Sequence, residues 1–514
     1  MGQHYDAIVL GAGHNGLVAA NYLAAAGVGV LVLERRDFIG GACVTEELFP
    51  GFRAPTCSYV CHLLQDKVIE DLELRRHGFA VYPLQPYRLH PFPDGQYIMI
   101  WPDDKDTVEE IRRVAPRDAE RFAGWTEFWQ RAAGILHRYF LQAPPSLTAV
   151  AAAVAGTADE EIFERMLTGS MKDLVEEYFE SDIVRATFIE AHDAGDVRAP
   201  GSIMAVAYIK CNYFTEARNV GIPHGGMGGI TQAMGRAAQE RGVEIRTGVE
   251  VERIAVRNGR AVGVVLQGGE EIGADVVLSN ADPKRTFLNL VEGEVLEPSF
   301  IAGIKRLKTE ISCLKFHCAL KELPDFSAYF GADFDPRYLA QVRICPSVAY
   351  FEQSWADARN GRPSSCPVMY VQIPSVYDES MTPPGQHIMS VWSLYAPVRL
   401  RQGTWDEVRQ EAGEHLIDTL ALYAPNVRQA IIDWQVFTPA DLEARVYLTD
   451  GNIRHLDIVP EQMLGRRPNR ELSGYRTPVE GLYLCGAGTH PGGEVTGAPG
   501  HNAAGVVLGD LGKG

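Results

Sequence analysis

Residues 5–34 of the chain read YDAIVLGAGHNGLVAANYLAAAGVGVLVLE, and this stretch predicts a strand, a glycine turn, a helix and a second strand. In the G-x-G-x-x-G turn, Gly11 permits the tight bend, Gly13 lets a pyrophosphate approach the backbone, and Gly16 lets the helix pack on the strand. Glu34 ends the second strand about 20 residues further on, where an acid bonds a ribose 2′-hydroxyl. The pattern therefore predicts the first βαβ unit of a domain that binds a dinucleotide without a 2′-phosphate.

The composition limits the class of protein. A chain of 514 residues is too long for one ordinary core, so two or three domains are expected. The net charge of −18 disfavours nucleic acid and anionic membranes as electrostatic partners, because both require a basic surface. Nine scattered cysteines without a C-x-x-C pair favour a reducing compartment and argue against a redox dithiol and a metal site. Without an evident targeting segment or membrane span, a cytoplasmic protein is expected.

Two insertions interrupt the dinucleotide-binding pattern. Residues 60–219 are mostly helical, and the apolar spacing predicts an amphipathic helix over 107–140. The βαβ pattern returns at 222–283. Residues 284–460 predict a mixed sheet with covering helices, including an amphipathic helix whose apolar residues run to Leu422.

The last stretch carries a second glycine-rich signature. Residues 481–511 read GLYLCGAGTHPGGEVTGAPGHNAAGVVLGDL and predict a buried strand, a turn and a helix of small residues. The amino end of that helix offers backbone N–H groups to an electron-rich carbonyl edge, such as that of a reduced flavin ring.

These motifs together resemble the FAD-dependent amine oxidase and phytoene desaturase superfamily. There the first motif is followed by an acid, a basic residue and a paired glycine, as in ERRDFIGGA over 34–42. Relatives also carry P-x-G-G-x-G where this chain has PHGGMG at 223–228, and the last stretch is similar to the flavin segment of carotenoid desaturases. The opening looks most like the branch of pyridine nucleotide-disulfide oxidoreductase domain-containing proteins, with desaturase-like β-carotene ketolases near it.

The resemblance implies an α/β protein with a Rossmann-like FAD-binding domain of the glutathione reductase and amine oxidase type. That domain is discontinuous and takes residues 1–100, 220–300 and 461–514. A substrate-binding domain, with a mixed sheet and a helical lid, takes residues 101–219 and 301–460. The FAD is expected to be bound without a covalent link.

The resemblance also implies which residues contact the FAD. They are Gly11, Gly13, Asn15 and Gly16 at the pyrophosphate, Glu34 at the ribose, Gly41 and Ala42 near the phosphates, Val251 at the adenine, and Gly486, Glu494, Val495 and Thr496 by the ribityl chain and ring. By their position in the sequence, His14 contacts a phosphate or nothing, and Arg35 can face a phosphate or the adenine.

The catalytic groups are assigned from their position near the flavin motifs. His455 and His490 are the candidates for a general acid or base, although His490 could equally brace its glycine loop. Amine oxidases of the superfamily commonly place a lysine near the flavin and an aromatic cage at its ring, and neither can be assigned from the sequence.

Three functions stay open. The first is an FAD-dependent dehydrogenase or desaturase of an extended apolar substrate, isoprenoid or lipid-like; the second is an amine oxidase; the third is a redox-neutral isomerase or a partner-binding flavoprotein. Because no second G-x-G-x-x-G is present, oxygen or a quinone is the expected electron acceptor. A lid, or a face in peripheral contact with a membrane, is expected from the aromatic residues of the helical insertion, with core packing as the alternative: Trp125, Phe128, Trp129, Tyr139 and Phe140.

Overall fold

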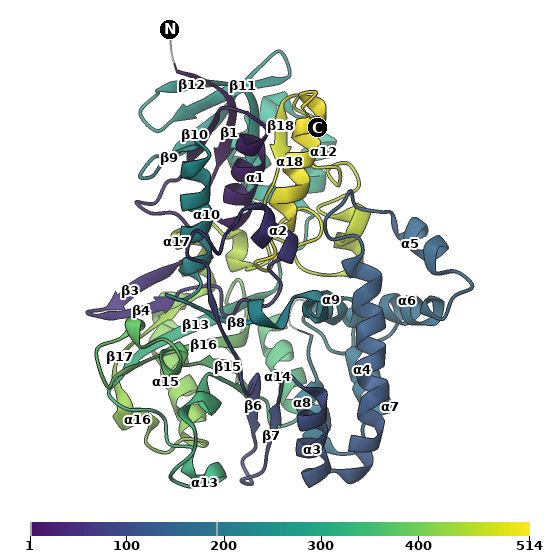
Figure 1. Ribbon diagram of the computed structural model, residues 1–514, viewed down its shortest axis with the longest axis vertical. Helices are drawn as coiled ribbons and strands as arrows, with labels where there is room; N and C mark the ends of the chain where they lie inside the picture. The colour runs from purple at the N-terminus through teal and green to yellow at the C-terminus, as the bar shows by residue number, and fades with distance from the viewer. Residues whose placement is uncertain (1–2, 192–193, 514) are drawn as a thin grey trace.

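A computed structural model of the chain describes residues 3–191 and 194–513. Figure 1 shows two lobes stacked along the long axis, with both ends of the described chain at the upper lobe. The upper lobe contains the predicted nucleotide-binding elements, the lower one contains a second sheet, and helices α3 to α9 lie beside them. The fold is therefore α/β, as the sequence predicts.

The sheet of the upper lobe is built around β1 (His4–Leu10). β1 pairs in parallel with β2 (Val30–Leu33) on one side and with β12 (Glu271–Ser279) on the other, so distant segments meet at the glycine turn. The strand order is β10-β11-β12-β1-β2-β9, and β18 also pairs with β12. The remaining strands of this sheet are β9 (Glu244–Arg246), β10 (Val251–Arg257), β11 (Arg260–Leu266) and β18 (Leu482–Leu484).

Helices of small residues pack closely on this sheet. A Cβ on Gly16 would lie 2.2 Å from the Gly11 carbonyl oxygen, and one on Gly500 would lie 2.1 Å from the Asn15 carbonyl oxygen. Glycine at both positions therefore allows α1 to approach β1 and α18 to approach α1. Gly27, at φ +76°, is a left-handed residue just beyond the end of α1. The helices of this lobe are α1 (His14–Ala25), α2 (Asp66–Asp71), α10 (Gly228–Glu240), α11 (Pro283–Arg285), α12 (Pro298–Lys305) and α18 (Ala498–Asp510).

The lower lobe is a mixed sheet with strand order β17-β13-β16-β15-β14-β6-β7. The strand β13 (Ser312–Leu320), second in this order, pairs with a strand on each side and is buried along its whole length. The other strands are β6 (Arg88–Pro91), β7 (Tyr97–Ile100), β14 (Gln341–Ile344), β15 (Val368–Gln372), β16 (His387–Ala396) and β17 (Ile431–Phe437). The helices of residues 301–460 are α13 (Ser327–Phe330), α14 (Val348–Arg359), α15 (Trp405–Ala421), α16 (Val427–Ala430) and α17 (Pro439–Val446).

Strand pairing differs from the predicted domain boundary in one place. β6 and β7 lie within residues 1–100, which were assigned to the nucleotide-binding domain, yet β6 pairs with β14 of the lower sheet. These strands are four residues long, too short for a periodicity signal, and only the non-local pairing defines their sheet. Two small ribbons connect the lobes, β3 (Thr45–Phe49) with β4 (Phe52–Pro55) and β5 (Val81–Pro83) with β8 (Gly221–Pro223).

The helical insertion is divided more finely than the sequence predicts. The helix predicted over 107–140 is two helices, because Ala115, at φ −150° and ψ 78°, is not helical and Pro116 starts the second one. Among the described residues, no helix has both the length and the apolar character that a membrane crossing requires. The helical elements here are α3 (Asp104–Val114), α4 (Pro116–His137), α5 (Leu147–Val154), α6 (Asp159–Thr168), α7 (Met171–Tyr178), α8 (Asp182–Phe188), α9 (Ser202–Ile209) and the 3-10 helix η2 (Lys210–Phe214).

The aromatic residues expected in a lid lie mostly in the core. Trp129 and Phe140 are 0% and 2% exposed, and Trp125 and Phe128 pack edge-on against Trp129. An apolar stripe shows which face of a helix is buried but not what covers it, so the expectation of a lid built from these rings is wrong. Leu422, predicted as part of an apolar helix face, lies beyond α15 and is 72% exposed.

Replacing Trp129 by alanine should lower the free energy of unfolding by about 3–5 kcal/mol, because the cavity lies in the middle of a packed aromatic cluster. The melting temperature should fall, and bound flavin should be lost in the same transition. Leu422→Ala is the control and should change stability by less than about 0.5 kcal/mol. A Trp129→Ala protein of unchanged stability would contradict the burial of this ring.

Candidate functional site

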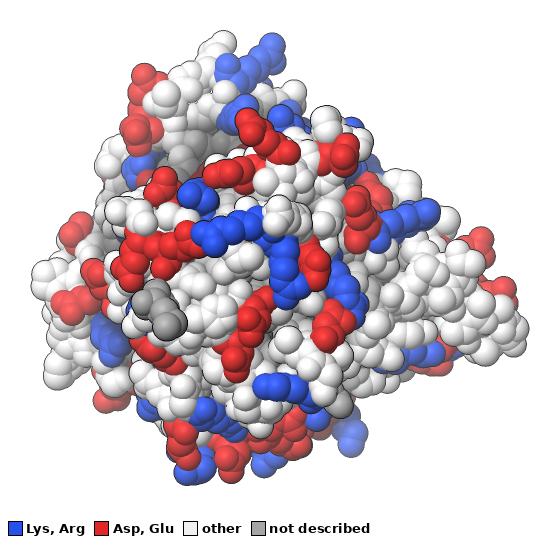
Figure 2. All heavy atoms as spheres, turned by 90° about the horizontal axis from the view of Figure 1, so that it is seen from above, with Lys and Arg blue, Asp and Glu red and all other residues white. Residues whose placement is uncertain are grey.

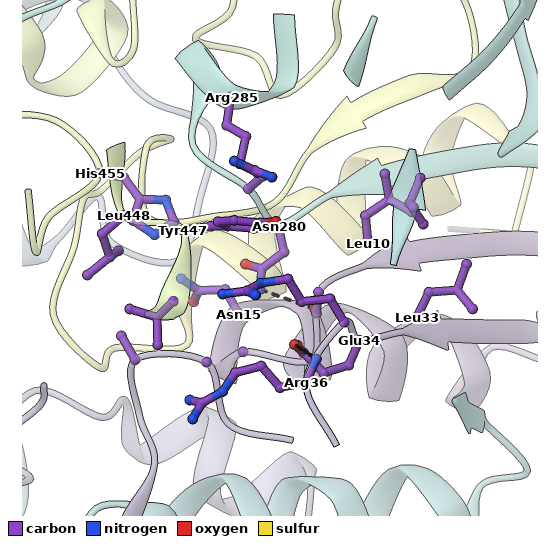
Figure 3. A pocket seen from close by; sticks show the side chains of 18 of the residues that line it. Leu10, Asn15, Leu33, Glu34, Arg36, Asn280, Arg285, Tyr447, Leu448 and His455 are labelled. Atoms are coloured by element: carbon purple, nitrogen blue, oxygen red, sulfur yellow. Dashed lines mark hydrogen bonds between the residues drawn. The ribbon is translucent and has the colours of Figure 1, made fainter. Parts of the chain in front are cut away.

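The first pocket lies where the parallel strands of the upper sheet end. Leu10, Leu33 and Asn280 line it at the carboxyl ends of β1, β2 and β12, which is where open α/β sheets bind ligands. Figure 3 shows these residues converging with Tyr447 and His455 from the far end of the chain. The predicted nucleotide site is therefore completed by residues that follow the lower sheet in sequence.

The turn after β1 leaves room for a ligand because it lacks side chains. A Cβ on Gly13 would lie 2.9 Å from the side-chain nitrogen of Asn280, and one on Gly41 would lie 3.1 Å from the Gly13 Cα. Gly41 is also left-handed at φ +56°, which favours glycine. The backbones of Gly13 and Gly41 therefore lie close together at the pocket wall, and their lack of side chains leaves the space that a phosphate requires.

Glu34 is buried at the end of β2. Its Oε2 accepts a hydrogen bond from the Ala12 N–H at 2.9 Å, and its Oε1 accepts one from the Arg36 N–H at 3.0 Å. Each carboxylate oxygen can still accept another bond, so the position is compatible with the predicted ribose contact. Arg36 lines the same pocket with one guanidinium nitrogen, Nη1, that is buried without a hydrogen-bond partner.

A stack of two arginines and one tyrosine closes the pocket. The guanidinium carbons of Arg285 and Arg35 lie 3.1 and 3.7 Å from the centre of the Tyr447 ring. Arg35 also donates through Nη2 to the carbonyls of Ala444 and Arg445, which holds its guanidinium against the pocket wall. The sequence predicted Arg35 near a phosphate or the adenine but missed Arg285 and Tyr447, which come from separate segments.

A second pocket continues from the first. His14, Ala42, Leu448, His455 and Ala487 line both pockets, which places them at the junction. Beyond the junction the walls come from the lower sheet, from loops and from the helical insertion, and the residues include Tyr59, Tyr370, Trp392, Ile453, Glu494 and Val495. The two pockets therefore form one path from the glycine turn to the lower lobe.

Unpaired polar atoms along this path test whether a dinucleotide fits. His14 Nε2, Asn15 Oδ1 and His455 Nδ1 are buried without a hydrogen-bond partner, and so are Arg36 Nη1 and Ser58 Oγ. All these residues line one pocket or both. Buried polar atoms are rarely left unpaired, so their clustering on these walls fits a ligand with many oxygens and ring nitrogens, as FAD has.

The two candidate catalytic histidines have different surroundings. His455 is at the junction of the pockets, whereas His490 lines neither and lies 2.7 Å through Nε2 from the Tyr139 carbonyl oxygen. Burial lowers the pKa of each to about 4, so both are neutral at neutral pH. His490 braces its loop, and a catalytic assignment for it is not supported by this geometry.

The remaining predicted ligands divide into wall residues and supporting residues. Val251 lines the first pocket, and Glu494 and Val495 line the second. Gly16, Gly486 and Thr496 line neither, because they pack in the backbone layer behind the walls; a Cβ on Gly486 would lie 2.6 Å from the Asn280 carbonyl oxygen. The cofactor contacts expected for these three stay predictions.

Lys315 is a buried residue that the sequence analysis missed. It lies on β13, its Nζ has no hydrogen-bond partner, and it sits 4.1 Å from the centre of the Tyr59 ring. Burial lowers the pKa of Lys315 to about 8. The signal was a lone lysine in the otherwise apolar run SCLKFHCAL, which places an ammonium group behind the wall formed by Cys57 and Tyr59.

Gly13→Val should abolish flavin retention, because the branched side chain would fill the space between Gly13 and the pocket and contact Asn280. The ratio of flavin to protein after gel filtration measures the loss, with circular dichroism as a check on folding. Gly505→Ala on α18 is the control, since a Cβ there meets nothing within 4 Å. Full flavin occupancy in a folded Gly13→Val protein would refute the nucleotide assignment.

Acid should destabilise the protein through its buried histidines. The folded-state pKa values of His14, His455 and His490 are lowered from 6.5 to about 4, so the unfolded chain binds protons first as the pH falls. Their stabilising effect is complete above pH 6.5 and is lost between 6.5 and 4, on the order of 3 kcal/mol for each.

The melting temperature measured across that pH range checks this loss. His490→Gln should make the decline shallower, because an amide can keep the bond to the Tyr139 carbonyl without titrating. The matched control is His4→Gln, since the His4 side chain is 58% exposed. Identical slopes for the two variants would show that the burial of His490 does not contribute.

Comparison with known proteins agrees with this geometry. A family model described as flavin-containing amine oxidoreductase matches residues 16–317. The rat pyridine nucleotide-disulfide oxidoreductase domain-containing protein 2 is 34% identical over 99% of this chain and 94% of its own length. A limonene dehydrogenase subunit of Castellaniella defragrans is 30% identical over 99% of this chain and 95% of its own length.

A desaturase and a solved structure extend the comparison. The neurosporene-forming phytoene desaturase of Rhodobacter capsulatus is 27% identical over 95% of this chain and 91% of its own length. The fold resembles that of cyclohexylamine oxidase from Brevibacterium oxydans, with a TM-score of 0.58, 15% identity and 99% of each chain covered. The predicted superfamily and fold class are confirmed. The family model covers more than half of the chain and the first two relatives nearly all of it, so the chain belongs to the flavin-containing amine oxidoreductase family.

Proposed function

We propose that this protein uses non-covalent FAD to dehydrogenate an extended apolar substrate, isoprenoid or lipid-like. The observation that carries the proposal is the continuity of the two pockets, which joins the glycine cradle to a chamber walled by aromatic rings. A substrate in that chamber would lie next to the ring end of a dinucleotide whose phosphates are at the glycine turn.

The chain's own residues would hold the cofactor by polar contacts. Gly13 and Gly41 leave space for the pyrophosphate, Glu34 meets the ribose, and His14 and His455 present unpaired ring nitrogens at the junction. When bound, FAD supplies an acceptor for two electrons, which the amino-acid side chains cannot provide.

The chamber wall is rigid and largely apolar. The Tyr59 hydroxyl donates to the Ser390 carbonyl at 2.8 Å and accepts from the Trp392 N–H at 3.0 Å, which fixes its ring. The rings of Tyr370 and Trp392 lie 4.9 Å apart at 32°, next to Tyr59. Such a wall would orient a flat unsaturated chain and exclude water from the reacting carbon.

His455 would act here as a neutral group. Because burial lowers its pKa to about 4, it is a weak base at neutral pH, and its free Nδ1 is better suited to accept a hydrogen bond than to remove a proton. Dehydrogenation takes a hydride and a proton from adjacent carbons. Once the hydride is lost, the adjacent C–H of the cationic substrate would be acidic enough to give its proton to water or to a weak base, so no strong base on the enzyme is needed, which is compatible with this site.

The names of two relatives support the substrate class, since one belongs to a limonene dehydrogenase and another is a phytoene desaturase. For reoxidation we propose oxygen or a quinone, because the sequence has a single G-x-G-x-x-G. An entrance from an apolar phase is proposed at Tyr213 and Phe214, which are 40% and 43% exposed and follow Asn212 on the pocket wall, in place of the buried Trp129.

An amine oxidase is the second candidate. The three rings of Tyr59, Tyr370 and Trp392 with Lys315 behind them supply the aromatic walls and the buried lysine that the sequence alone did not reveal. Lys315 does not line the pocket, however, so the dehydrogenase is the better-supported function.

Anaerobic titration of the flavin-loaded protein separates the two candidates. Phytoene or limonene should bleach the flavin absorbance, and air or a soluble quinone should restore it, whereas cyclohexylamine and NADPH should leave it unchanged. Bleaching by the amine that is lost in Lys315→Met would favour the amine oxidase. Rapid reduction by NADPH would contradict the proposed acceptor.

A further inference from the structure

The mostly apolar wall of the second pocket carries two charged clusters, one in which Glu494 lies beside Arg454 and His62, and a second one on the wall formed by β6 and η2. Arg88 from β6, Glu190 and Lys210 from η2 line it together, and none of them lines the first pocket. The Arg88 guanidinium donates to Glu190 Oε1 at 2.9 Å, and their side chains are 14% and 5% exposed. This pair is therefore a compensated, buried ion pair.

Lys210 is not compensated in the same way. Its Nζ lies 3.9 Å from Glu190 Oε2, beyond hydrogen-bonding distance, and it has no hydrogen-bond partner among the described residues. Its side chain is 22% exposed, and burial lowers the pKa of the ammonium group. A partly desolvated cation without a hydrogen bond is costly unless a ligand supplies one.

Counted with Lys210 itself, cations outnumber carboxylates among the described groups that act most strongly on it. The described groups that act on it are the acids Glu190 and Asp104 and the cations Arg88 and Arg343. With Lys210 itself there are more cations than carboxylates in this region, in a protein whose net charge is −18. Among these described groups, Lys210 included, positive charge is in excess.

Asn212 provides a second free group on the same short helix. It lines the pocket two residues after Lys210, and its side-chain Oδ1 is buried without a hydrogen-bond partner. The oxygen and nitrogen of an amide can exchange places by a flip, so Asn212 can present an N–H donor here. An ammonium and an amide on one turn can together bind the two oxygens of a carboxylate.

We infer that the substrate of this pocket is an amphiphile, with an apolar chain along Tyr370 and Trp392 and a carboxylate bound by Lys210 and Asn212. The inference rests on the proposed function, because it describes the substrate of the same chamber. Unlike a hydrocarbon substrate, this amphiphile has an anionic end group, which lies next to Arg88 and Lys210.

Three probes with the same C15 chain test the inference: farnesoic acid, farnesol and farnesylamine. Their dissociation constants can be measured on the flavin-loaded protein from the shift they cause in the flavin spectrum, without turnover. The acid should bind about tenfold more tightly than the alcohol, and the amine should bind most weakly. Equal affinities for acid and alcohol would overturn the inference.

The variant Lys210→Met keeps the length and apolar stem of the side chain and should remove the preference for the acid while leaving the affinity for the alcohol unchanged. Lys210→Arg is the matched control and should keep the preference, and Asn212→Leu should reduce it. An equal loss of both affinities in Lys210→Met would mean that Lys210 only packs the wall, which contradicts a carboxylate site.

The outcomes also separate this inference from the proposed function. Reduction of the flavin by farnesol or phytoene without any preference for the acid would keep the dehydrogenase and refute the carboxylate site. A Lys210-dependent preference for the acid, with no reduction of the flavin by any isoprenoid, would support the site and refute the dehydrogenase.

Discussion

The buried carboxylate of Glu34 is the interaction on which the nucleotide site depends. It accepts hydrogen bonds from the Ala12 N–H in the glycine turn and from the Arg36 N–H beyond β2. These bonds join the ends of two adjacent strands and keep the space between them in a fixed shape. A carboxylate that is 6% exposed is stable only with such donors, so the turn and the acid require each other.

Hydrogen bonds close to the same turn also join the two lobes. The Ser58 N–H donates to the carbonyl of Ala42, which follows Gly41, at 3.2 Å. The hydroxyl of the adjacent Tyr59 donates to the backbone of β16. One short segment therefore fixes the distance between the phosphate end of the path and the lower sheet. Figure 2 shows acidic and basic side chains interspersed on the upper face. Because the two signs of charge are mixed on that face, we expect the contacts inside the path, and not surface charge, to position a ligand.

Local pattern and non-local contact explain which features could be predicted from the sequence. The βαβ unit was predictable because Gly11, Gly13 and Glu34 act within one continuous stretch. The stack of Arg285 on Tyr447 joins separate segments, and the pairing of β6 with β14 does so as well, so neither leaves a periodic signal. The aromatic stripe around Trp129 correctly indicated burial, but only the packed structure shows that protein, rather than a ligand, covers it.

Arg343 and Lys210 are two cations near the second pocket whose surroundings differ. Arg343 is fully buried, and its guanidinium donates to the carbonyls of Ala186 and Thr187 at 2.9 and 3.2 Å, so its cost of burial is offset within the protein. Lys210 has no such bond among the described residues although it lies on the pocket wall. An apolar chamber disfavours a cation that lacks a hydrogen bond, and an anionic group at that position when the protein works would offset this cost.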